Sequence, residues 1–230
     1  MTRAFIDLHC HTSASFDSLA DPAKMVRAAA SRGLTHLIVT DHDRIDGALA
    51  ARAAAPAGMT VIVGEEIKTA EGDLIAAFLE RAVPPGMSAA ETVAAVRGQG
   101  GLVGIPHPFD RMRGSVGSET RMSALAPLVD WIEVHNARLI GSGNEQAAVF
   151  ARERGMAGVA VSDAHSVLEV GVAYTALDGD PSTPAGLLAA LPTAEIVPGR
   201  ATYFVRLWTP IAKAVNRIRG NGRVLPDTPA

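Results

Sequence analysis

Six of the seven histidines in this 230-residue chain stand at or just after the end of a short apolar run. These six are His9, His11, His42, His107, His135 and His165, whereas His36 opens such a run. Carboxylates accompany several of them, as in DLHCHT, VTDHD and VSDAH. Imidazole nitrogens and carboxylate oxygens together bind divalent ions that catalyse hydrolysis. The pattern therefore indicates a catalytic metal centre.

Two of these clusters have a spacing that suits an extended strand. His9 and His11 are two residues apart, so their side chains point to the same face while Cys10 points to the other. Asp163 and His165 have the same spacing. An isolated H-x-H pair is just as consistent with two hydrogen-bonded surface histidines, because the pattern is short. The evidence lies in the clusters taken together.

Two further clusters offer carboxylates. Asp41 and Asp43 flank His42, and either could fix the tautomer of a metal-binding imidazole through its second ring nitrogen. Glu65 and Glu66 follow an apolar run, and one of two adjacent carboxylates could point into the site and bridge two ions. An acidic turn exposed to solvent is an equally good reading of that pair alone.

The remaining observations narrow the kind of metal site. Pro106 and Pro108 restrict the backbone around His107. Cys10 is the one cysteine, so the chain has neither an internal disulfide nor a cysteine cluster for structural zinc, and we expect Cys10 to be a small buried apolar residue. A metal would be held by histidine and carboxylate, as in catalytic sites.

The elements that must position these residues alternate regularly. Apolar runs rich in β-branched residues predict strands at 5–9, 36–40, 60–63, 73–79, 101–106, 131–135, 158–162 and, as a further candidate, 174–177. Alanine-rich runs predict helices at 22–33, 45–55, 88–99 and 144–154. Strands separated by helices indicate parallel pairing, and about seven units are enough to close a barrel. In such a barrel the carboxyl ends of the strands carry the active site.

Composition and charge restrict the partners. The net charge is −3 and no run of lysine and arginine appears, so a long nucleic acid is an unlikely partner. No apolar stretch approaches the roughly 20 residues that span a membrane, and the first residues do not resemble a signal peptide. We expect a soluble, cytoplasmic protein with one domain over residues 1–200 and an amphipathic segment with a tail over 201–230. The sequence leaves the oligomeric state open.

Taken in order, the motifs DLHCHTSASFDS, VTDHD, GEEI, PHP and SDAH resemble the PHP family, which is named for polymerase and histidinol phosphatase. The resemblance covers about residues 4–177. It implies a distorted seven-stranded β/α barrel of the TIM-like kind, two or three divalent ions of manganese, zinc or iron, and hydrolysis of phosphate esters by activated water. It also leaves open a noncatalytic metal-stabilised module, because some members lack catalysis.

The resemblance also implies which residues hold the ions. His9 and His11 would bind one ion together with a bridging Glu66 and with Asp163. A second ion would be bound by Asp17, His42 and His165. A third would lie between Glu66 and His107. Asp73 stands where many members have a histidine, and an oxygen ligand there favours a harder ion such as manganese. Asp7, Asp41 and Asp43 would support the ligands from outside.

Other residues would meet the substrate. Arg111, Arg113 and Arg138 follow site histidines, and guanidinium groups match phosphate oxygens in pairs. His135 is expected to line the pocket, and His36 to be structural. The expected substrate is a small phosphate ester of a nucleotide, sugar or amino alcohol. An amidohydrolase is a weaker alternative, because Lys68 is the one lysine near a strand end that could bridge two ions after carbamylation.

Overall fold

The computed structural model describes residues 2–110, 115–202, 205 and 208–224. Within this part of the chain nine strands form one sheet in the order β7-β6-β5-β4-β3-β2-β1-β8-β9. The strands are β1 Arg3–Asp7, β2 His36–Val39, β3 Thr60–Lys68, β4 Asp73–Ala77, β5 Leu102–Ile105, β6 Trp131–Asn136, β7 Ala157–Val161, β8 Tyr174–Asp178 and β9 Glu195–Val197.

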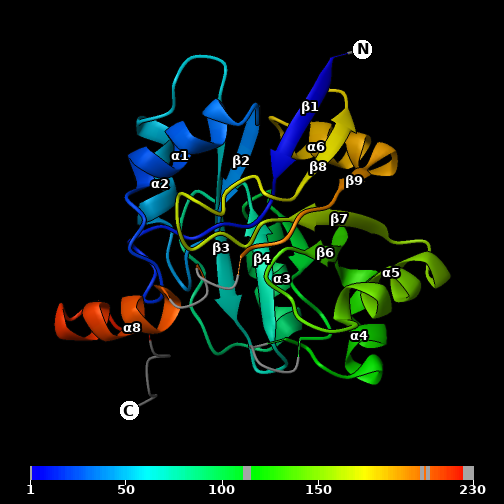
Figure 1. The fold of residues 1–230 in the computed structure, drawn as a ribbon. Helices are drawn as coiled ribbons and strands as arrows, with labels where there is room; N and C mark the ends of the chain where they lie inside the picture. Colours follow the sequence, from blue (N-terminus) through cyan, green and yellow to red (C-terminus); the bar gives the residue numbers. More distant parts are fainter. Residues whose placement is uncertain (1, 111–114, 203–204, 206–207, 225–230) are drawn as a thin grey trace.

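The sheet curves round until its first and seventh strands meet. A parallel bridge joins Cys10 to Ala164 just beyond β1 and β7. The backbone amide of Ser162 also donates to the Asp7 carboxylate at 2.9 Å. Near the other end β8 fills the gap, because Thr175 Oγ lies 2.9 Å from both backbone groups of Ala160 on β7. The result is a nearly closed barrel, which confirms the expected single-domain, distorted TIM-like fold (Figure 1).

The expectation of parallel pairing throughout needs a correction. β4 runs antiparallel to both β3 and β5, and β8 runs antiparallel to β1. β3 extends to Lys68 rather than ending at Val63, and a tight turn in which Thr69 Oγ donates to the Gly72 carbonyl returns the chain directly into β4. A turn this short joins antiparallel neighbours, whereas parallel strands need a longer crossover.

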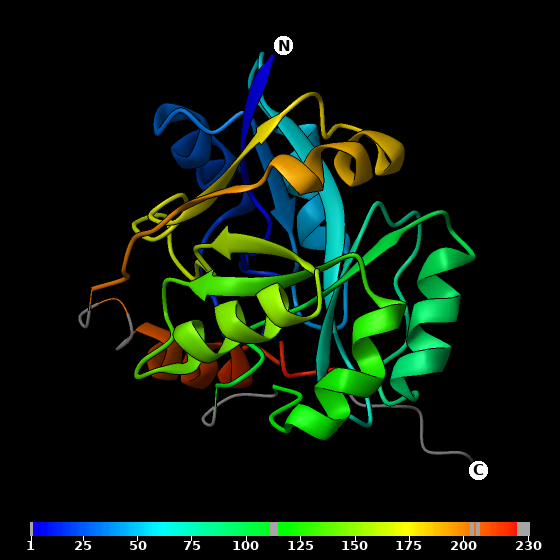
Figure 2. The same ribbon diagram turned by 90° about the vertical axis from the view of Figure 1, so that its right-hand side faces the viewer.

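The helices lie outside the sheet and begin at recognisable caps. Their bounds are α1 Pro22–Ser31, α2 Asp46–Ala53, α3 Ala89–Arg97, α4 Glu119–Leu125, α5 Gly143–Glu153, α6 Pro184–Ala190 and α8 Trp208–Ile218. Asp21 caps α1, and Ser88 forms a capping box with Glu91 at α3. Figure 2 shows α3 and α5 covering one side of the barrel. The sequence patterns did not predict α4, α6 or β9.

The apolar core has two parts. One fills the barrel itself and includes Ile6, Ile38 and Trp131, and Leu187 of α6 joins it. The other lies between the strands and the outer helices and includes Cys10, which is fully buried as expected. Helix α6 thus closes one end of the barrel. The carboxyl ends of β1, β2, β5 and β7 open at the other end.

Candidate metal centre

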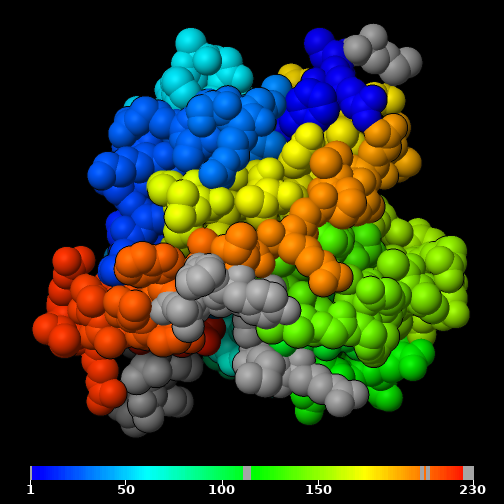
Figure 3. Space-filling model, in the orientation of Figure 1, coloured from blue at the N-terminus to red at the C-terminus, as the bar shows by residue number. Residues whose placement is uncertain are grey.

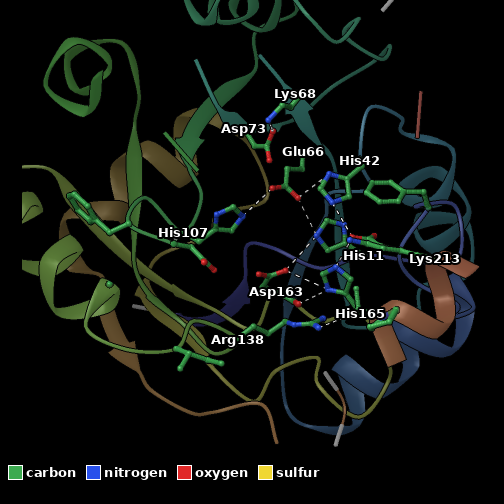
Figure 4. Close-up of a pocket in the computed structure, with 18 of the residues that line it drawn as sticks. His11, His42, Glu66, Lys68, Asp73, His107, Arg138, Asp163, His165 and Lys213 are labelled. Carbon is green, nitrogen blue, oxygen red and sulfur yellow. Dashed lines mark hydrogen bonds and ion pairs between the residues drawn. The ribbon is translucent and has the colours of Figure 1, made fainter. Parts of the chain in front are cut away.

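A pocket of about 890 Å³ opens at the carboxyl ends of the parallel strands. Eight of the nine predicted metal ligands line it: His11, Asp17, His42, Glu66, Asp73, His107, Asp163 and His165. The ninth, His9, has no exposed surface and lies beneath them. Figure 4 shows the side chains of His11, His42, Glu66, Asp73, His107, Asp163 and His165 converging on one pocket. Their role as ligands stays a prediction, but the structure brings them together.

The first group of ligand atoms consists of four atoms around one point. Nε2 of His9 and Nε2 of His11 lie 2.9 Å apart, and each is 3.3 Å from Glu66 Oε2. Asp163 Oδ1 is 3.7 Å from the His9 nitrogen and 3.6 Å from the His11 nitrogen. Ligands about 2.1 Å from a tetrahedral ion are separated by about 3.4 Å. The spacing therefore fits a divalent ion between these atoms.

The second group lies next to the first. Asp17 Oδ2 is 3.1 Å from His165 Nε2 and 3.3 Å from His42 Nε2. The other nitrogen of His42, Nδ1, is 3.3 Å from Glu66 Oε2. Glu66 Oε2 thus lies beside both groups but faces the His42 nitrogen that does not contact Asp17, and His11 is the residue with a ring nitrogen close to the ligand atoms of both groups.

A third position is less complete. Glu66 Oε1 lies 3.2 Å from His107 Nε2, as a shared ion would require. Asp73 lines the same part of the pocket, but its Oδ1 faces two cations, Lys68 Nζ at 3.2 Å and Arg223 Nη2 at 3.7 Å. Two ligand groups are therefore formed in full, and the third has only two ligand atoms facing each other.

Carboxylates and imidazoles in this pocket shift each other's protonation. Burial alone would raise the pKa of Glu66, but the neighbouring His42 and His9 hold it well below its usual range. Burial opposes the charged form of His42 too, yet Glu66 and Asp17 raise its pKa to about 9. For His165, burial and the nearby Arg138 lower the pKa to about 4. Three carboxylates packed against imidazoles need positive charge, which a divalent ion supplies better than protons.

The backbone at these strand ends is strained. Asp43, His107 and Asp163 have φ angles of 56°, 26° and 53°, in the left-handed region that residues other than glycine seldom adopt. Within the described chain, Phe78 is the other such residue. Such strain persists where the surrounding structure holds it, and it commonly marks functional sites.

Residues that the sequence analysis missed orient the ligands. Glu133 Oε1 lies 2.7 Å from His9 Nδ1, so the ring donates there and keeps Nε2 for a metal. Asn136 Nδ2 donates to Glu133 Oε2 at 2.9 Å and to Asp163 Oδ2 at 3.1 Å. The sequence did contain a signal for this role, because Glu133 is an acidic residue within the apolar run WIEVH. A carboxylate is costly to bury unless it is paired, so an acid in a buried strand indicates a polar partner.

Asp41 and Asp43 were predicted to support a metal-binding imidazole, but they accept hydrogen bonds from Thr12, Lys68 and Arg223 instead. Asp41 accepts from the amide and hydroxyl of Thr12 at 2.6 and 2.7 Å. Asp43 accepts from the Lys68 amide at 2.8 Å and from Arg223. The expectation that either fixes the His42 tautomer is therefore corrected, because both nitrogens of that ring face Asp17 and Glu66.

Asp7 also supports backbone, and it does so from the first strand. Its carboxylate accepts from the amides of Ser162 and Gly171 at 2.9 and 3.0 Å. The His9 amide lies farther away, at 3.5 Å. Burial raises the pKa of Asp7 to about 6. Asp7 thus fastens the ends of β1 and β7 together beneath the site.

Of the residues predicted to contact the substrate, the structure places Arg138 in the pocket and His135 outside its lining. Arg138 lines the pocket, where its Nη2 donates to Thr209 Oγ at 2.7 Å and its Nη1 lies 3.5 Å from Glu169 Oε1. His135 does not line the pocket, because the pairing register shifts between Glu133 and His135 and the His135 ring meets the Gly199 carbonyl at 2.8 Å. Arg111 and Arg113 lie outside the described residues.

Three cations on the pocket wall were not predicted to meet the substrate. Lys68, Lys213 and Arg223 line the same cavity as Arg138. Figure 4 shows Lys68 on one side of the histidines and Arg138 on the opposite side, with Lys213 on α8. The pocket can therefore surround an anion with positive side chains. His36, by contrast, contacts Thr35 and Ser182 and is not among the residues that line the pocket, in agreement with a structural role.

Comparison with known proteins identifies the family. The model of the PHP domain matches residues 7–125, and that of the PHP-associated C-terminal region matches residues 141–195. The chain therefore belongs to the PHP domain family, as its motifs and its barrel indicate.

The chain is also similar in sequence to individual proteins. The chain is 33% identical over 142 residues to an uncharacterized protein of Methanocaldococcus jannaschii, which covers 57% of this chain and 81% of the relative. It is 41% identical over 70 residues to a 5'-3' exoribonuclease of Haemophilus influenzae, which covers 30% of this chain and 25% of that protein. Only a quarter of the exoribonuclease is thus matched.

A solved structure has the same fold. It is the two-domain protein containing a predicted PHP-like metal-dependent phosphoesterase from Bacteroides vulgatus, which superposes with a TM-score of 0.73 at 20% identity. The match covers 86% of this chain and 65% of that one. In the part of our chain that the structure describes, no helix is both long and apolar enough to cross a membrane.

Proposed function

We propose that the protein is a metal-dependent phosphoesterase that hydrolyses a small phosphate ester, such as that of a nucleotide, sugar or amino alcohol. The observation that carries the proposal is the presence of two adjoining groups of metal-ligand atoms, which share His11, inside a pocket lined by cations. When bound, divalent ions polarise phosphoryl oxygens and lower the pKa of water toward about 7. Manganese, zinc and iron all suit these nitrogen and oxygen ligands.

The side chains of the pocket would bind and orient the ester. Arg138 has only 8% of its side chain exposed, and its Nη1 has no hydrogen-bond partner among the described residues. A phosphate oxygen would complete its hydrogen bonding, because guanidinium pairs readily with phosphate. Glu169 and Thr209 hold the guanidinium in place. No side chain needs to act as a nucleophile in this account.

The size of the pocket supports a small substrate. A cavity of about 890 Å³ lies within the range of roughly 300–1,000 Å³ typical of small-molecule sites. The amidohydrolase alternative is less well supported, because Glu66 already stands between the histidines and Lys68 pairs with Asp73. The cytoplasmic location expected from the sequence stays a prediction.

Phosphate release tests the proposal. The protein, purified without chelator and supplied with manganese, is given 4-nitrophenyl phosphate and a panel of nucleotides, sugar phosphates and amino-alcohol phosphates. We expect release that stops with chelator and in His9→Gln. His36→Gln is the matched control, because it removes a histidine far from the pocket and should keep the activity.

The other outcomes point to the alternatives. Tight metal binding without release from any ester would favour the noncatalytic module. Release from 5'-phosphorylated oligonucleotides and none from small esters would favour a nucleic-acid end as substrate. Either result would contradict the proposed substrate class.

A further inference from the structure

The C-terminal segment formed by α8 and residues 219–224 lies beyond both regions that the family models match. It nevertheless packs against the loop of residues 12–18, which follows β1 and carries Asp17 (Figure 1). In the space-filling view its orange-red atoms lie against the blue N-terminal part of the chain (Figure 3). Thr209, Lys213 and Arg223 of this segment also line the metal pocket.

The contact depends on a buried polar side chain. Asn216 is 2% exposed and faces inward from α8, although Ile211 and Ile218 of the same helix are exposed. Its Nδ2 donates to the Ser15 carbonyl at 3.1 Å and to the Ser18 carbonyl at 2.9 Å. A buried amide that donates twice to one loop fixes the loop, because moving the loop would leave buried carbonyls without partners.

The loop in turn fixes Asp17, which belongs to the second group of metal ligands. Ser15 Oγ donates to Asp17 Oδ1 at 2.7 Å, which leaves Oδ2 facing the imidazoles. Those imidazoles belong to His165 and His42. Ser18 Oγ lies 3.1 Å from the His11 carbonyl and 3.0 Å from the His165 carbonyl, so the loop is also tied to the strand ends.

A second amide fastens the start of the same loop. Asn221 Nδ2 donates to the carbonyls of Ser13 and Ala14 at 3.1 and 3.2 Å. Arg44 Nη1 donates to Asn221 Oδ1 at 2.8 Å and to the Ala14 carbonyl at 3.0 Å. Residues beside the first group come from other elements, because Glu66 belongs to β3 and Glu133, which faces His9, belongs to β6.

We propose that Asn216 is a positioning residue that holds Asp17 in the geometry of the second metal position, so that the C-terminal segment is a working part of the active site. The proposal rests on the metal dependence proposed above. Outer residues that orient metal ligands typically contribute about 10–100-fold to metal affinity. Loss of Asn216 should therefore weaken one ion and leave the ion bound by His9, His11 and Asp163 in place.

The test compares Asn216→Leu, which has a similar shape without the donors, with Arg217→Leu, an exposed neighbour on the same helix. Manganese content after dialysis and manganese titration calorimetry are measured on both, on the wild type and on Asp17→Asn, alongside thermal unfolding. We expect two ions in the wild type and in Arg217→Leu. Asn216→Leu should keep one ion and bind the other about 10–100-fold more weakly. Asp17→Asn should weaken the same ion. Raised manganese should restore the activity of Asn216→Leu.

Other results would overturn the inference. Two ions with unchanged affinities in folded Asn216→Leu, or equal weakening of both ions, would show that the contact is merely structural. If Asn216→Leu does not fold, Asn221→Ala removes the milder contact and should weaken the same single ion severalfold; unchanged binding there would count against the inference. A wild type that binds no metal would instead refute the proposed function itself.

Discussion

At the scale of residues, two adjacent glutamates on one strand have opposite environments. Glu66 points into the pocket and contacts imidazoles, whereas Glu65 is fully buried on the other face and accepts from the Val83 amide at 2.8 Å. Burial, aided by the charge of Asp43 and opposed by the Val83 amide, raises the pKa of Glu65 to about 8. Because neighbouring side chains of a strand point to opposite faces, Glu66 is placed as a predicted metal ligand and Glu65 as a buried neutral acid.

This difference predicts a pH effect on stability. Between the ordinary pKa of 4.5 and the folded value of about 8, folded Glu65 binds more protons than unfolded Glu65. Its contribution to the unfolding free energy therefore falls as pH rises, by up to about 1.4 kcal/mol per pH unit. Glu65→Gln cannot ionise, so in urea unfolding of metal-free protein it should gain stability relative to wild type from pH 5 to pH 8. An equal difference at both pH values would contradict this.

A second prediction concerns Arg138. Arg138→Ala should lower kcat/KM at least about tenfold, which corresponds to about 1.4 kcal/mol of transition-state stabilisation. Arg138→Lys should recover only part of it, because an ammonium lacks the paired geometry of guanidinium. Arg97→Ala is a suitable control, since that arginine pairs with Asp130 and is not among the residues that line the pocket. Steady-state kinetics with the most rapidly hydrolysed ester measures this effect. An unchanged kcat/KM for Arg138→Ala would show that Arg138 does not bind the phosphate.

At the scale of elements, the ends of the strands explain what the sequence could predict. His11, Asp163 and His165 line the pocket and His9 lies beneath it, although all four follow β1 and β7 rather than lying within these strands. His135 fails the same rule, because a register shift in β6 turns it away, and no sequence pattern marks that shift. The strand at β4 was predicted but its antiparallel direction was not, since an apolar run looks the same in either direction. Asn216 acts through contacts with residues 198 and 201 positions away in the chain, which local patterns cannot show.

Packing between strands gives a further prediction. A Cβ at Gly104 of β5 would lie 2.1 Å from the Trp131 indole, which is fully buried on the neighbouring β6. Gly104→Ala should therefore destabilise the protein by about 1–3 kcal/mol or more. Gly222→Ala is the matched control, because nothing lies within 4 Å of its Cβ position. Chemical unfolding of both variants tests this, and equal midpoints would contradict the close packing.

At the scale of the whole molecule, α6 closes one end of the barrel and the C-terminal segment borders the pocket at the other. The site draws residues from the segments that follow the first and seventh strands and from α8, so it forms only in the folded chain. Because unfolded chain would not assemble these ligands, metal binding adds to the free energy of unfolding.

This coupling can be measured. Chelator should lower the thermal midpoint, and manganese at about 100 times its Kd should restore about 2.7 kcal/mol of stability for each bound ion. His9→Gln should respond less to manganese than wild type, whereas His36→Gln should respond equally. Thermal scans with and without chelator provide the comparison. A midpoint that does not change with manganese in the wild type would argue against a site formed by folding.

The most direct test of the central claim is anomalous diffraction from crystals of the protein loaded with manganese. We expect one anomalous peak among His9, His11, Glu66 and Asp163 and a second among Asp17, His42 and His165. Anomalous density absent from both positions in a fully loaded crystal, or confined to surface carboxylates, would contradict it.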